Sequence, residues 1–252
     1  MYFFNRKKIG LALGCGGAKG LAHIGVLKIL EEKNYRIQCI AGSSAGALIG
    51  GLYAYFKDSK KVEEIFQEQN LGSMLKIATD LKIKKGVIRG KKLRDMINQY
   101  VQGVNIEDLE IPFAAVATDL YSGKKVVIKN GLLSEAIMAS IAIPIVFNPV
   151  EYKDTLLMDG GIVEPVPYKT VKDMGCRRIL GVDLSKDQLA GEDPNALARF
   201  YEIMLKEVAE YQERDAWKII SPEFNGSVSL FKFADGKDII DKGEMEARRV
   251  LG

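Results

Sequence analysis

The sequence predicts an α/β protein in which helices cross over between the strands of a central sheet. Along the chain, apolar residues change between strand-like and helix-like spacing. Two glycine clusters each follow an apolar strand-like run and precede a helix-like segment. The size agrees: 252 residues, 47% of them hydrophobic, with no internal repeat or linker-like stretch, predict a single domain over residues 1–252.

Two strand–helix units open the chain. Ile9 to Leu13 is a short apolar run, and beyond its glycines one helical face carries Leu21, Ile24, Leu27 and Leu30. Ile37 to Ala41 is the second strand and Gly42 to Gly46 its turn, and the next helix presents Leu48, Leu52 and Tyr55. The uncharged run Ile37 to Phe56 has about the 20 residues that a membrane-spanning helix needs, but its glycines and serines predict strand, turn and helix.

The remaining strands are expected further along the chain. They are Phe113 to Thr118, Lys125 to Ile128, Ile179 to Asp183 and Trp217 to Ile220. Tyr121 to Gly123 is expected to turn a hairpin. A helical stripe near the C-terminus is expected to pack in the core, and its residues are Leu197, Phe200, Met204, Leu205, Val208 and Tyr211.

Composition excludes several kinds of site. The 36 basic and 33 acidic side chains leave a net charge of +3, too small for an electrostatic nucleic-acid binder. One histidine, His23, cannot supply a metal site that needs two. Three cysteines, Cys15, Cys39 and Cys176, predict neither a zinc cluster nor a disulfide framework, and they favour a reducing, cytoplasmic compartment. Met1 to Lys8 lacks the pattern of a signal peptide.

A basic segment, Lys76 to Arg94, interleaves lysines and arginines with apolar residues around one acid, Asp80. One interpretation is a solvated helix and loop. The other is a surface that contacts anionic membrane, where each basic residue contributes about 1 kcal/mol near the headgroups. The second interpretation predicts peripheral membrane contact.

Gly42-Ser43-Ser44-Ala45-Gly46 matches the G-x-S-x-G nucleophile elbow, between a strand and a helix. Glycines relieve crowding in such a sharp turn, so the Ser44 hydroxyl can stand clear of the backbone. The alternative is a turn of small residues that packs under a helix. We favour Ser44 as a nucleophile.

The other glycine cluster, Gly14 to Gly20, also joins a strand to a helix, so its backbone N–H groups can face an anion. It fits neither the dinucleotide fingerprint, because Lys19 stands where glycine is required, nor a phosphate loop, because Gly20 follows Lys19. An oxyanion hole beside Ser44 fits better, with the Ala45 N–H as a further donor. A turn without a ligand is the alternative.

A serine nucleophile needs a proton acceptor, and no standard triad order with aspartate is available. No histidine follows Ser44, and no aspartate precedes His23. Between His23 and Ser44 the only acidic residues are Glu31 and Glu32. A carboxylate is therefore the remaining candidate for the base.

Three aspartates end apolar segments, where α/β active sites gather: Asp119, Asp159 and Asp183. Asp159 is favoured because Gly160-Gly161 follows it and lets the backbone turn tightly. The other two are expected to cap local backbone.

Together these motifs resemble the patatin-like phospholipases over nearly the whole chain. Leu13 to Leu27 resembles the family's glycine-rich oxyanion loop and first helix, Gly42 to Gly46 its nucleophile elbow, and Asp159-Gly160-Gly161 its Asp-Gly-Gly/Ala motif. Ala117 to Leu120 and Ala139 to Pro144 resemble further family segments. The resemblance implies a three-layer α/β/α sandwich with a central, mostly parallel sheet.

The resemblance also implies a Ser–Asp dyad, Ser44 and Asp159, and an oxyanion hole formed by the N–H groups of Gly16, Gly17 and Ala18. It implies a serine acyl hydrolase that cleaves lipid carboxylic esters, phospholipid or lysophospholipid, through an acyl-enzyme, with no metal or cofactor. It gives His23 no catalytic role, so we expect His23 to pack in the core.

Three positions depart from the family pattern. Cys15 stands at the first glycine of the loop, Lys19 where the family often has arginine, and Glu164 where asparagine is expected. Cys15 and Glu164 motivate the alternative function, a non-catalytic lipid- or anion-binding module that keeps this fold.

Overall fold

Strands and helices alternate along the chain in the computed structural model, which describes residues 7–68, 86–144, 146–185, 196–212, 214–224 and 236–252. The strands are β1 (Lys8–Leu13), β2 (Arg36–Ser43), β3 (Phe113–Asp119), β4 (Lys125–Ile128), β5 (Val150–Tyr152), β6 (Thr155–Asp159), β7 (Ile179–Val182) and β8 (Lys218–Ile220). The α-helices are α1 (Ala22–Glu32), α2 (Ala45–Phe56), α3 (Ser59–Glu68), α5 (Gly86–Val101), α6 (Leu133–Ser140), α7 (Tyr168–Asp173), α8 (Ala196–Tyr211) and α9 (Gly236–Leu251). Short 3₁₀ helices are η1 (Gly17–Leu21), η2 (Ile106–Asp108) and η3 (Gly160–Ile162).

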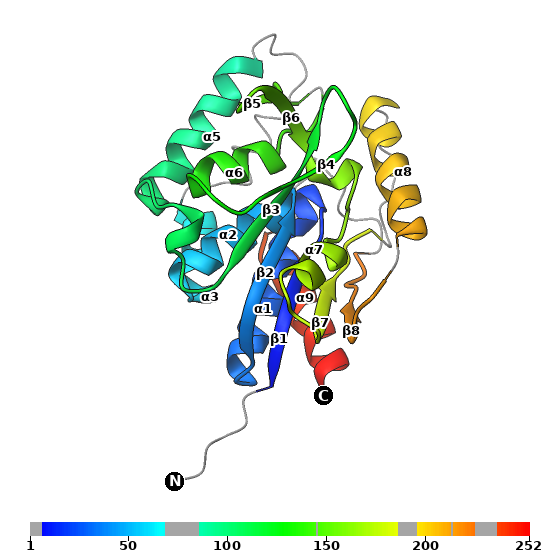
Figure 1. The fold of residues 1–252 in the computed structure, drawn as a ribbon. Coiled ribbons are helices and arrows are strands. Elements are labelled where there is room, and N and C mark those ends of the chain that lie inside the picture. Colours follow the sequence, from blue (N-terminus) through cyan, green and yellow to red (C-terminus); the bar gives the residue numbers. More distant parts are fainter. Residues whose placement is uncertain (1–6, 69–85, 145, 186–195, 213, 225–235) are drawn as a thin grey trace.

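An eight-stranded sheet runs in the order β5-β6-β3-β2-β1-β7-β8, with β4 beside β3. The strands from β3 to β8 in this order are parallel, and β4, β5 and β6 add antiparallel pairs on one side. In Figure 1, α7 lies in front of the strands, and α1 and α9 lie behind them. The chain therefore has the α/β architecture with a mostly parallel sheet that the sequence predicts.

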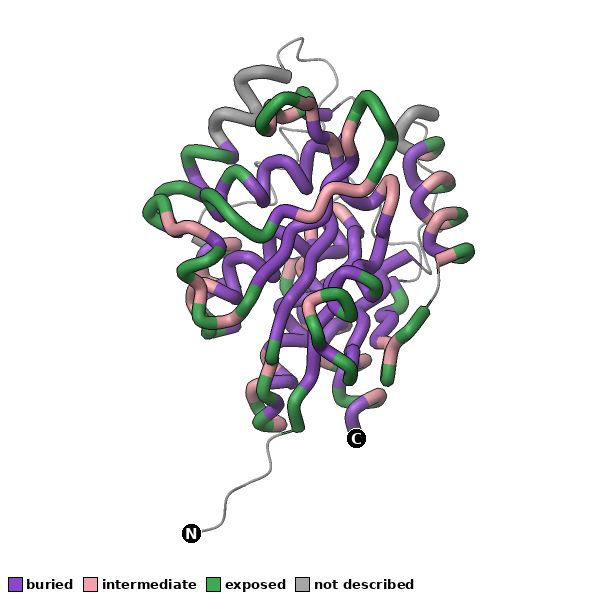
Figure 2. Tube along the Cα trace, in the orientation of Figure 1, coloured by how far each residue is buried: buried purple, intermediate pink, exposed green. Residues whose placement is uncertain are grey.

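Both faces of the central strands are buried, as Figure 2 shows by their colour. In β1, Leu11 and Leu13 belong to the larger core cluster, whereas Ala12 belongs to a second cluster that includes Tyr168 and Val171 of α7. Successive side chains of a strand point to opposite faces. Burial on both sides explains why β1 is a continuous apolar run and not an alternating one.

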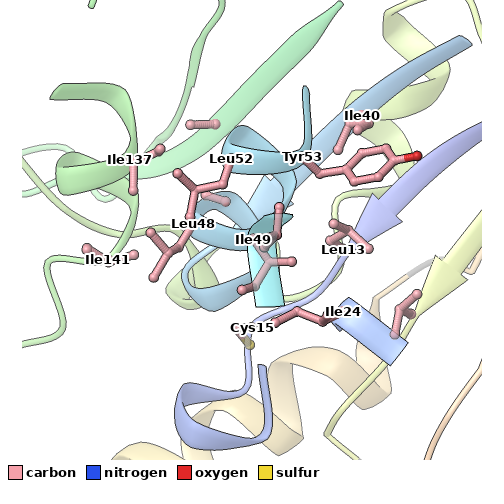
Figure 3. Packing of buried hydrophobic residues seen from close by; sticks show 14 of the residues in the cluster. Leu13, Cys15, Ile24, Ile40, Leu48, Ile49, Leu52, Tyr53, Ile137 and Ile141 are labelled. Carbon is pink, nitrogen blue, oxygen red and sulfur yellow. The ribbon is translucent and has the colours of Figure 1, made fainter. Parts of the chain in front are cut away.

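Helix α2 lies at the centre of the larger cluster. Figure 3 shows Leu48 and Leu52 on the side of Ile137 and Ile141, and Ile49 on the side of Leu13, Cys15 and Ile24. Apolar contacts around α2 fix the helix that begins directly after Ser44.

Strand register brings two distant segments to either side of β3. Ser43 at the end of β2 pairs with Val116 of β3. Asp159 at the end of β6 pairs with Ala117, the next residue of β3. The residues that follow β2 and those that end β6 are therefore separated by a single strand.

The predicted strands are present, with small differences at their ends, and the uncharged run Ile37 to Phe56 forms β2 and α2 as predicted. None of the described helices is both long and apolar enough to cross a bilayer. The hairpin β5–β6 was not predicted. Its connection holds Lys153 at φ 52°, and lysine gives none of the Asn-Gly or Asp-Gly signal of a two-residue turn.

Two of the three cysteines lie together in the structure, which the sequence did not predict. The Sγ atom of Cys39 in β2 is in contact with that of Cys176, which follows α7. The cysteines are 137 positions apart in the sequence, but α7 covers β2 and brings the segment after it back to the sheet.

The apolar stripe of α8 is only partly in the core. Leu205 is buried, but Phe200 is 63% exposed and Tyr211 is 87% exposed. The buried face instead follows Tyr201, Leu205 and Ala209, which recur every four residues. The prediction that the apolar stripe forms the buried face of this helix was therefore only partly right.

Part of the basic segment Lys76 to Arg94 lies outside the described residues. This holds for residues 76–85 and for the side chains of residues 86–92.

Candidate active site

Ser44 stands at a sharp turn between β2 and α2. Its φ of 54° is positive, a conformation that side chains other than glycine rarely adopt. A Cβ on Gly46 would lie 2.1 Å from the Leu13 carbonyl oxygen, and one on Gly42 would lie 2.4 Å from the Gly46 carbonyl oxygen. Both glycines are needed because backbone passes where a side chain would be.

Hydrogen bonds hold this strained turn. The Ser44 N–H donates to Ser140 Oγ over 3.0 Å, and the Ser140 hydroxyl donates to the Val116 carbonyl over 2.6 Å. The Ser43 hydroxyl donates to the Glu164 carbonyl over 2.7 Å. Ser140 thus links the elbow to β3.

Asp159 is completely buried and is held from three directions. Its N–H donates to the Ala142 carbonyl over 3.0 Å, and its carbonyl accepts from the Thr118 hydroxyl over 2.8 Å. Its Oδ1 accepts the Gly161 N–H over 2.7 Å. The carboxylate orientation is therefore fixed by the turn that Gly160-Gly161 makes.

The structure brings the Ser44 and Asp159 side chains together. Burial raises the pKa of Asp159 to about 6, against the lowering effect of the neighbouring Ser44 hydroxyl, the Gly161 N–H and the neighbouring Tyr201 hydroxyl. Desolvation disfavours the charged carboxylate, and these donors favour it. A carboxylate with a pKa near 6 is a stronger base than an ordinary aspartate but is still mostly ionised at pH 7.

The glycine loop lies against the elbow. A Cβ on Gly20 would be 2.4 Å from the Ala45 Cβ, and Gly17 has a φ of 53°. Within the described residues, the N–H groups of Gly16, Gly17, Ala18 and Ala45 have no backbone acceptor. The loop and the start of α2 therefore offer unpaired donors next to each other.

His23 is buried and stabilises this loop. Its Nε2 donates to the Gly14 carbonyl over 2.8 Å. Burial lowers the pKa of His23 to about 4, so the ring is neutral at pH 7. Its donating nitrogen is occupied by Gly14, which agrees with the packing role expected for it.

The structure explains the three departures from the family pattern. Cys15 has no positive φ, so its Cβ is tolerated, and burial, then the charges of Asp159 and Asp183, raise the pKa of its thiol. Lys19 is buried with its Nζ 5.4 Å from the centre of the Phe224 ring. The Glu164 carboxylate is paired with Lys125 over 2.9 Å and accepts the Thr170 N–H over 3.1 Å at the start of α7.

The other two strand-end aspartates cap local backbone, as expected. Asp119 Oδ1 accepts the N–H groups of Tyr121 and Ser122 over 3.0 and 2.7 Å in the β3–β4 hairpin. Asp183 Oδ1 accepts the Ser185 N–H over 2.9 Å. Both carboxylates therefore stabilise the turns that follow their strands.

Sequence reasoning missed two side chains of this site. Ser140, which holds the elbow, lies in the segment Ala139 to Pro144 that resembles the family, so a signal for it was available. Tyr201 of α8, which lies near enough to Asp159 for the two to interact electrostatically, gave no signal in the sequence.

A strained serine between a parallel strand and a helix, beside a buried carboxylate and a loop with unpaired N–H groups, defines an α/β protein with the geometry of a serine hydrolase. The chain belongs to the patatin-like phospholipase family, whose sequence model matches residues 11–172. Family membership supports lipid hydrolase activity.

Several curated relatives are similar to this chain. An uncharacterized NTE family protein of Mycobacterium tuberculosis is 37% identical over 205 residues, which cover 79% of this chain and 56% of that protein. Patatin-like phospholipase domain-containing protein 6 of Homo sapiens is 33% identical over 186 residues, 71% of this chain and 14% of that protein. Lysophospholipase NTE1 of Cryptococcus neoformans is 32% identical over 181 residues, 71% of this chain and 11% of that protein. The chain thus spans about half of the first relative and a small part of the others.

Two solved structures share the fold. VipD from Legionella pneumophila has a TM-score of 0.55 at 14% identity, covering 96% of this chain and 66% of that one. ExoU in its complex with SpcU, from Pseudomonas aeruginosa, has a TM-score of 0.51 at 15% identity, covering 98% of this chain and 53% of that one. At such identities the likeness concerns the fold alone.

Proposed function

We propose that this protein is a serine acyl hydrolase that cleaves carboxylic esters of lipids, phospholipid or lysophospholipid, with Ser44 as nucleophile and Asp159 as base. The observation that carries the proposal is the contact between a strained serine and a buried carboxylate whose pKa is raised to about 6. Family membership and the lysophospholipase among the relatives support the lipid ester as substrate.

In the first step Asp159 accepts the Ser44 proton as Oγ attacks the ester carbonyl. The tetrahedral oxyanion is stabilised by N–H groups of Gly16, Gly17, Ala18 and Ala45, and one such donor is typically worth on the order of a hundredfold in rate. The alkoxide leaves with a proton from Asp159, and an acyl-Ser44 ester remains. Asp159 then takes a proton from water as the water oxygen attacks the acyl-enzyme, and it returns that proton to Ser44 Oγ as the bond to the acyl group breaks and the fatty acid leaves.

The test is hydrolysis of p-nitrophenyl esters of increasing chain length, followed by defined phospholipids and lysophospholipids. Ser44→Ala should abolish turnover. Ser221→Ala is the matched control, because Ser221 is also buried and its hydroxyl has no partner among the described residues. Full activity in Ser44→Ala would refute the proposal.

The alternative, a non-catalytic lipid- or anion-binding module, was motivated by Cys15 and Glu164. Both side chains have structural surroundings that leave the Ser44–Asp159 contact intact. The alternative predicts vesicle binding with no hydrolysis of any ester. Turnover that disappears in Ser44→Ala would exclude it.

Peripheral membrane contact through Lys76 to Arg94 is part of the proposal, because a lipid substrate lies in a membrane and the segment is basic. Binding to anionic vesicles should weaken as salt is raised. Sedimentation with phosphatidylserine vesicles at low salt tests this, and an equal affinity for neutral vesicles would contradict it.

A further inference from the structure

Helix α8 brings a tyrosine to the candidate base. Tyr201 is 6% exposed, and it lies one helical turn before Leu205 on the buried face of α8. Leu205 Cδ2 would be 2.9 Å from a Cβ on Gly161, the residue whose N–H binds Asp159 Oδ1. Helix α8 therefore packs on the turn after Asp159, and Tyr201 lies within reach of the charge of Asp159.

Two buried polar atoms in this region have no hydrogen-bond partner among the described residues. They are Asp159 Oδ2 and the Tyr201 hydroxyl, and the two groups lie close enough for the charge of Asp159 to act on Tyr201. A buried hydroxyl without a partner costs about 1–3 kcal/mol, so a phenol facing a carboxylate is strongly driven to donate to it. Oδ1 already accepts Gly161, which leaves Oδ2 for the two hydroxyls.

We propose that Tyr201 is a positioning residue whose hydroxyl donates to Asp159 and holds the carboxylate in place to receive the Ser44 proton. This inference rests on the proposed function. Tyr201 does not touch the substrate, and it acts through Asp159. When the Ser44 hydroxyl gives up its proton, the Tyr201 and Gly161 donors remain on the carboxyl group.

The charges around this contact agree with such a role. Burial, then the charges of Asp159 and Cys15 and the hydrogen bond to Asp159, raise the pKa of Tyr201 well above its usual value, so the phenol keeps its proton. Cys15, the other titratable side chain beside it, also stays neutral because its pKa is raised. Next along α8, buried Glu202 lies 3.5 Å from Arg199. The Tyr201 phenol therefore has a proton to donate throughout the working pH range.

The test is the pH dependence of kcat/KM in Tyr201→Phe, which keeps the ring and removes the hydroxyl. Losing a donor to the charged carboxylate should raise the pKa of Asp159. The acid limb, which is the fall of kcat/KM on the acid side of the pH profile, should therefore move up by about one pH unit. Activity should then fall about fivefold more at pH 6 than at pH 8, with KM nearly unchanged. Recovery at high pH distinguishes this effect from a packing defect.

Tyr168→Phe is the matched control. Tyr168 is buried, its hydroxyl also lacks a partner among the described residues, and its neighbouring carboxylate is Asp183. The acid limb should stay in place in this variant. An unmoved limb in Tyr201→Phe, or an equal shift in Tyr168→Phe, would overturn the inference.

A second measurement does not need activity. In the protein labelled with ¹³C-aspartate, the Asp159 carboxyl resonance, assigned with Asp159→Asn, should titrate about one pH unit higher in Tyr201→Phe. If the unmodified protein hydrolyses no ester, the proposed function fails, and this titration still decides whether Tyr201 donates to Asp159. If Tyr201→Phe does not fold, 3-fluorotyrosine at position 201, a stronger donor, should move the titration down, and no movement would refute the contact.

Discussion

Two neighbouring strands of this sheet end in aspartate, and the two carboxylates have opposite properties. Asp119 ends β3 at an open hairpin, where hydrogen bonds from the Thr155 hydroxyl, then from Ser122 and Tyr121, lower its pKa to about 2. Asp159 ends the antiparallel neighbour β6 in the core, where burial raises its pKa to about 6.

The difference shows that the surroundings, and not the residue type or the place at a strand end, decide how strongly each carboxylate binds a proton. Asp119 is satisfied by several donors near water, so its carboxylate is a weak base. Asp159 has fewer donors and is completely buried, so its charged form is less stable and binds a proton more readily.

The largest expected effect separates the two strand ends by activity. Asp159→Asn should lower kcat/KM for a medium-chain ester by about 10²–10⁴-fold, because the proton acceptor is lost. Asp119→Asn, the matched control, should keep the activity of the folded protein. Equal losses in both variants would mean that neither strand end is special.

The pH profile gives the next effect. A base must be ionised, so kcat/KM should fall as pH drops through about 6, the pKa of Asp159. At pH 5 the activity should be about tenfold below its plateau. An acid limb below pH 4 would point to an ordinary carboxylate such as Asp119.

Two glycine substitutions compare the turns that follow each strand. A Cβ on Gly160 would lie 2.1 Å from the Val116 carbonyl oxygen, whereas a Cβ on Gly123 meets nothing within 4 Å. Gly160→Ala should lower the free energy of unfolding by about 3 kcal/mol, through overpacking against backbone. Gly123→Ala should lower it by about 1 kcal/mol, because Gly123 has a φ of 65°. Urea unfolding of both variants measures the difference.

The two aspartates should make the free energy of unfolding change with pH in opposite directions. The pKa of Asp159 is raised on folding, so its contribution is fully present below pH 3.8 and is lost as pH rises to about 6. The pKa of Asp119 is lowered, so its contribution is present above pH 3.8 and is lost as pH falls toward 2. Asp159→Asn should therefore gain on the order of 1 kcal/mol of stability above pH 6. A lower melting temperature in that variant at pH 7.5 would contradict this sign.

The smallest effect is expected at His23. A glutamine can still donate to the Gly14 carbonyl, so His23→Gln should keep substantial activity and the same acid limb near pH 6. A loss as large as that of Asp159→Asn would mean that His23, and not Asp159, accepts the Ser44 proton.

Much of the fold could be predicted because its central strands are buried on both faces. β1 and β2 are continuous apolar runs with glycine turns, and these signals are local in the sequence. The hairpin β5–β6 could not be found, since Lys153 at its turn carries no turn signal. The Cys39–Cys176 pairing was also out of reach, because it depends on how α7 lies over the sheet.

The candidate site, like the fold, could be predicted from the sequence only in part. Chain order excluded a histidine triad and left three strand-end aspartates. The structure separates them by their neighbours, because Asp159 lies beside Ser44, whereas Asp119 and Asp183 accept N–H groups of the turns that follow them. The position of Tyr201 near Asp159 depends on which face of α8 packs against the rest of the protein. The apolar stripe favoured Phe200, whereas the structure buries Tyr201.

The most direct test of the Ser44–Asp159 pair is the rate at which a fluorophosphonate labels the protein, followed by mass spectrometry from pH 4.5 to 8.5. The account predicts a label on Ser44, with a rate that rises to a plateau with a midpoint near pH 6. In Asp159→Asn that rate should collapse at every pH, and in Asp119→Asn it should be unchanged. Labelling of Ser44 at the same rate with and without the Asp159 carboxylate would contradict the account.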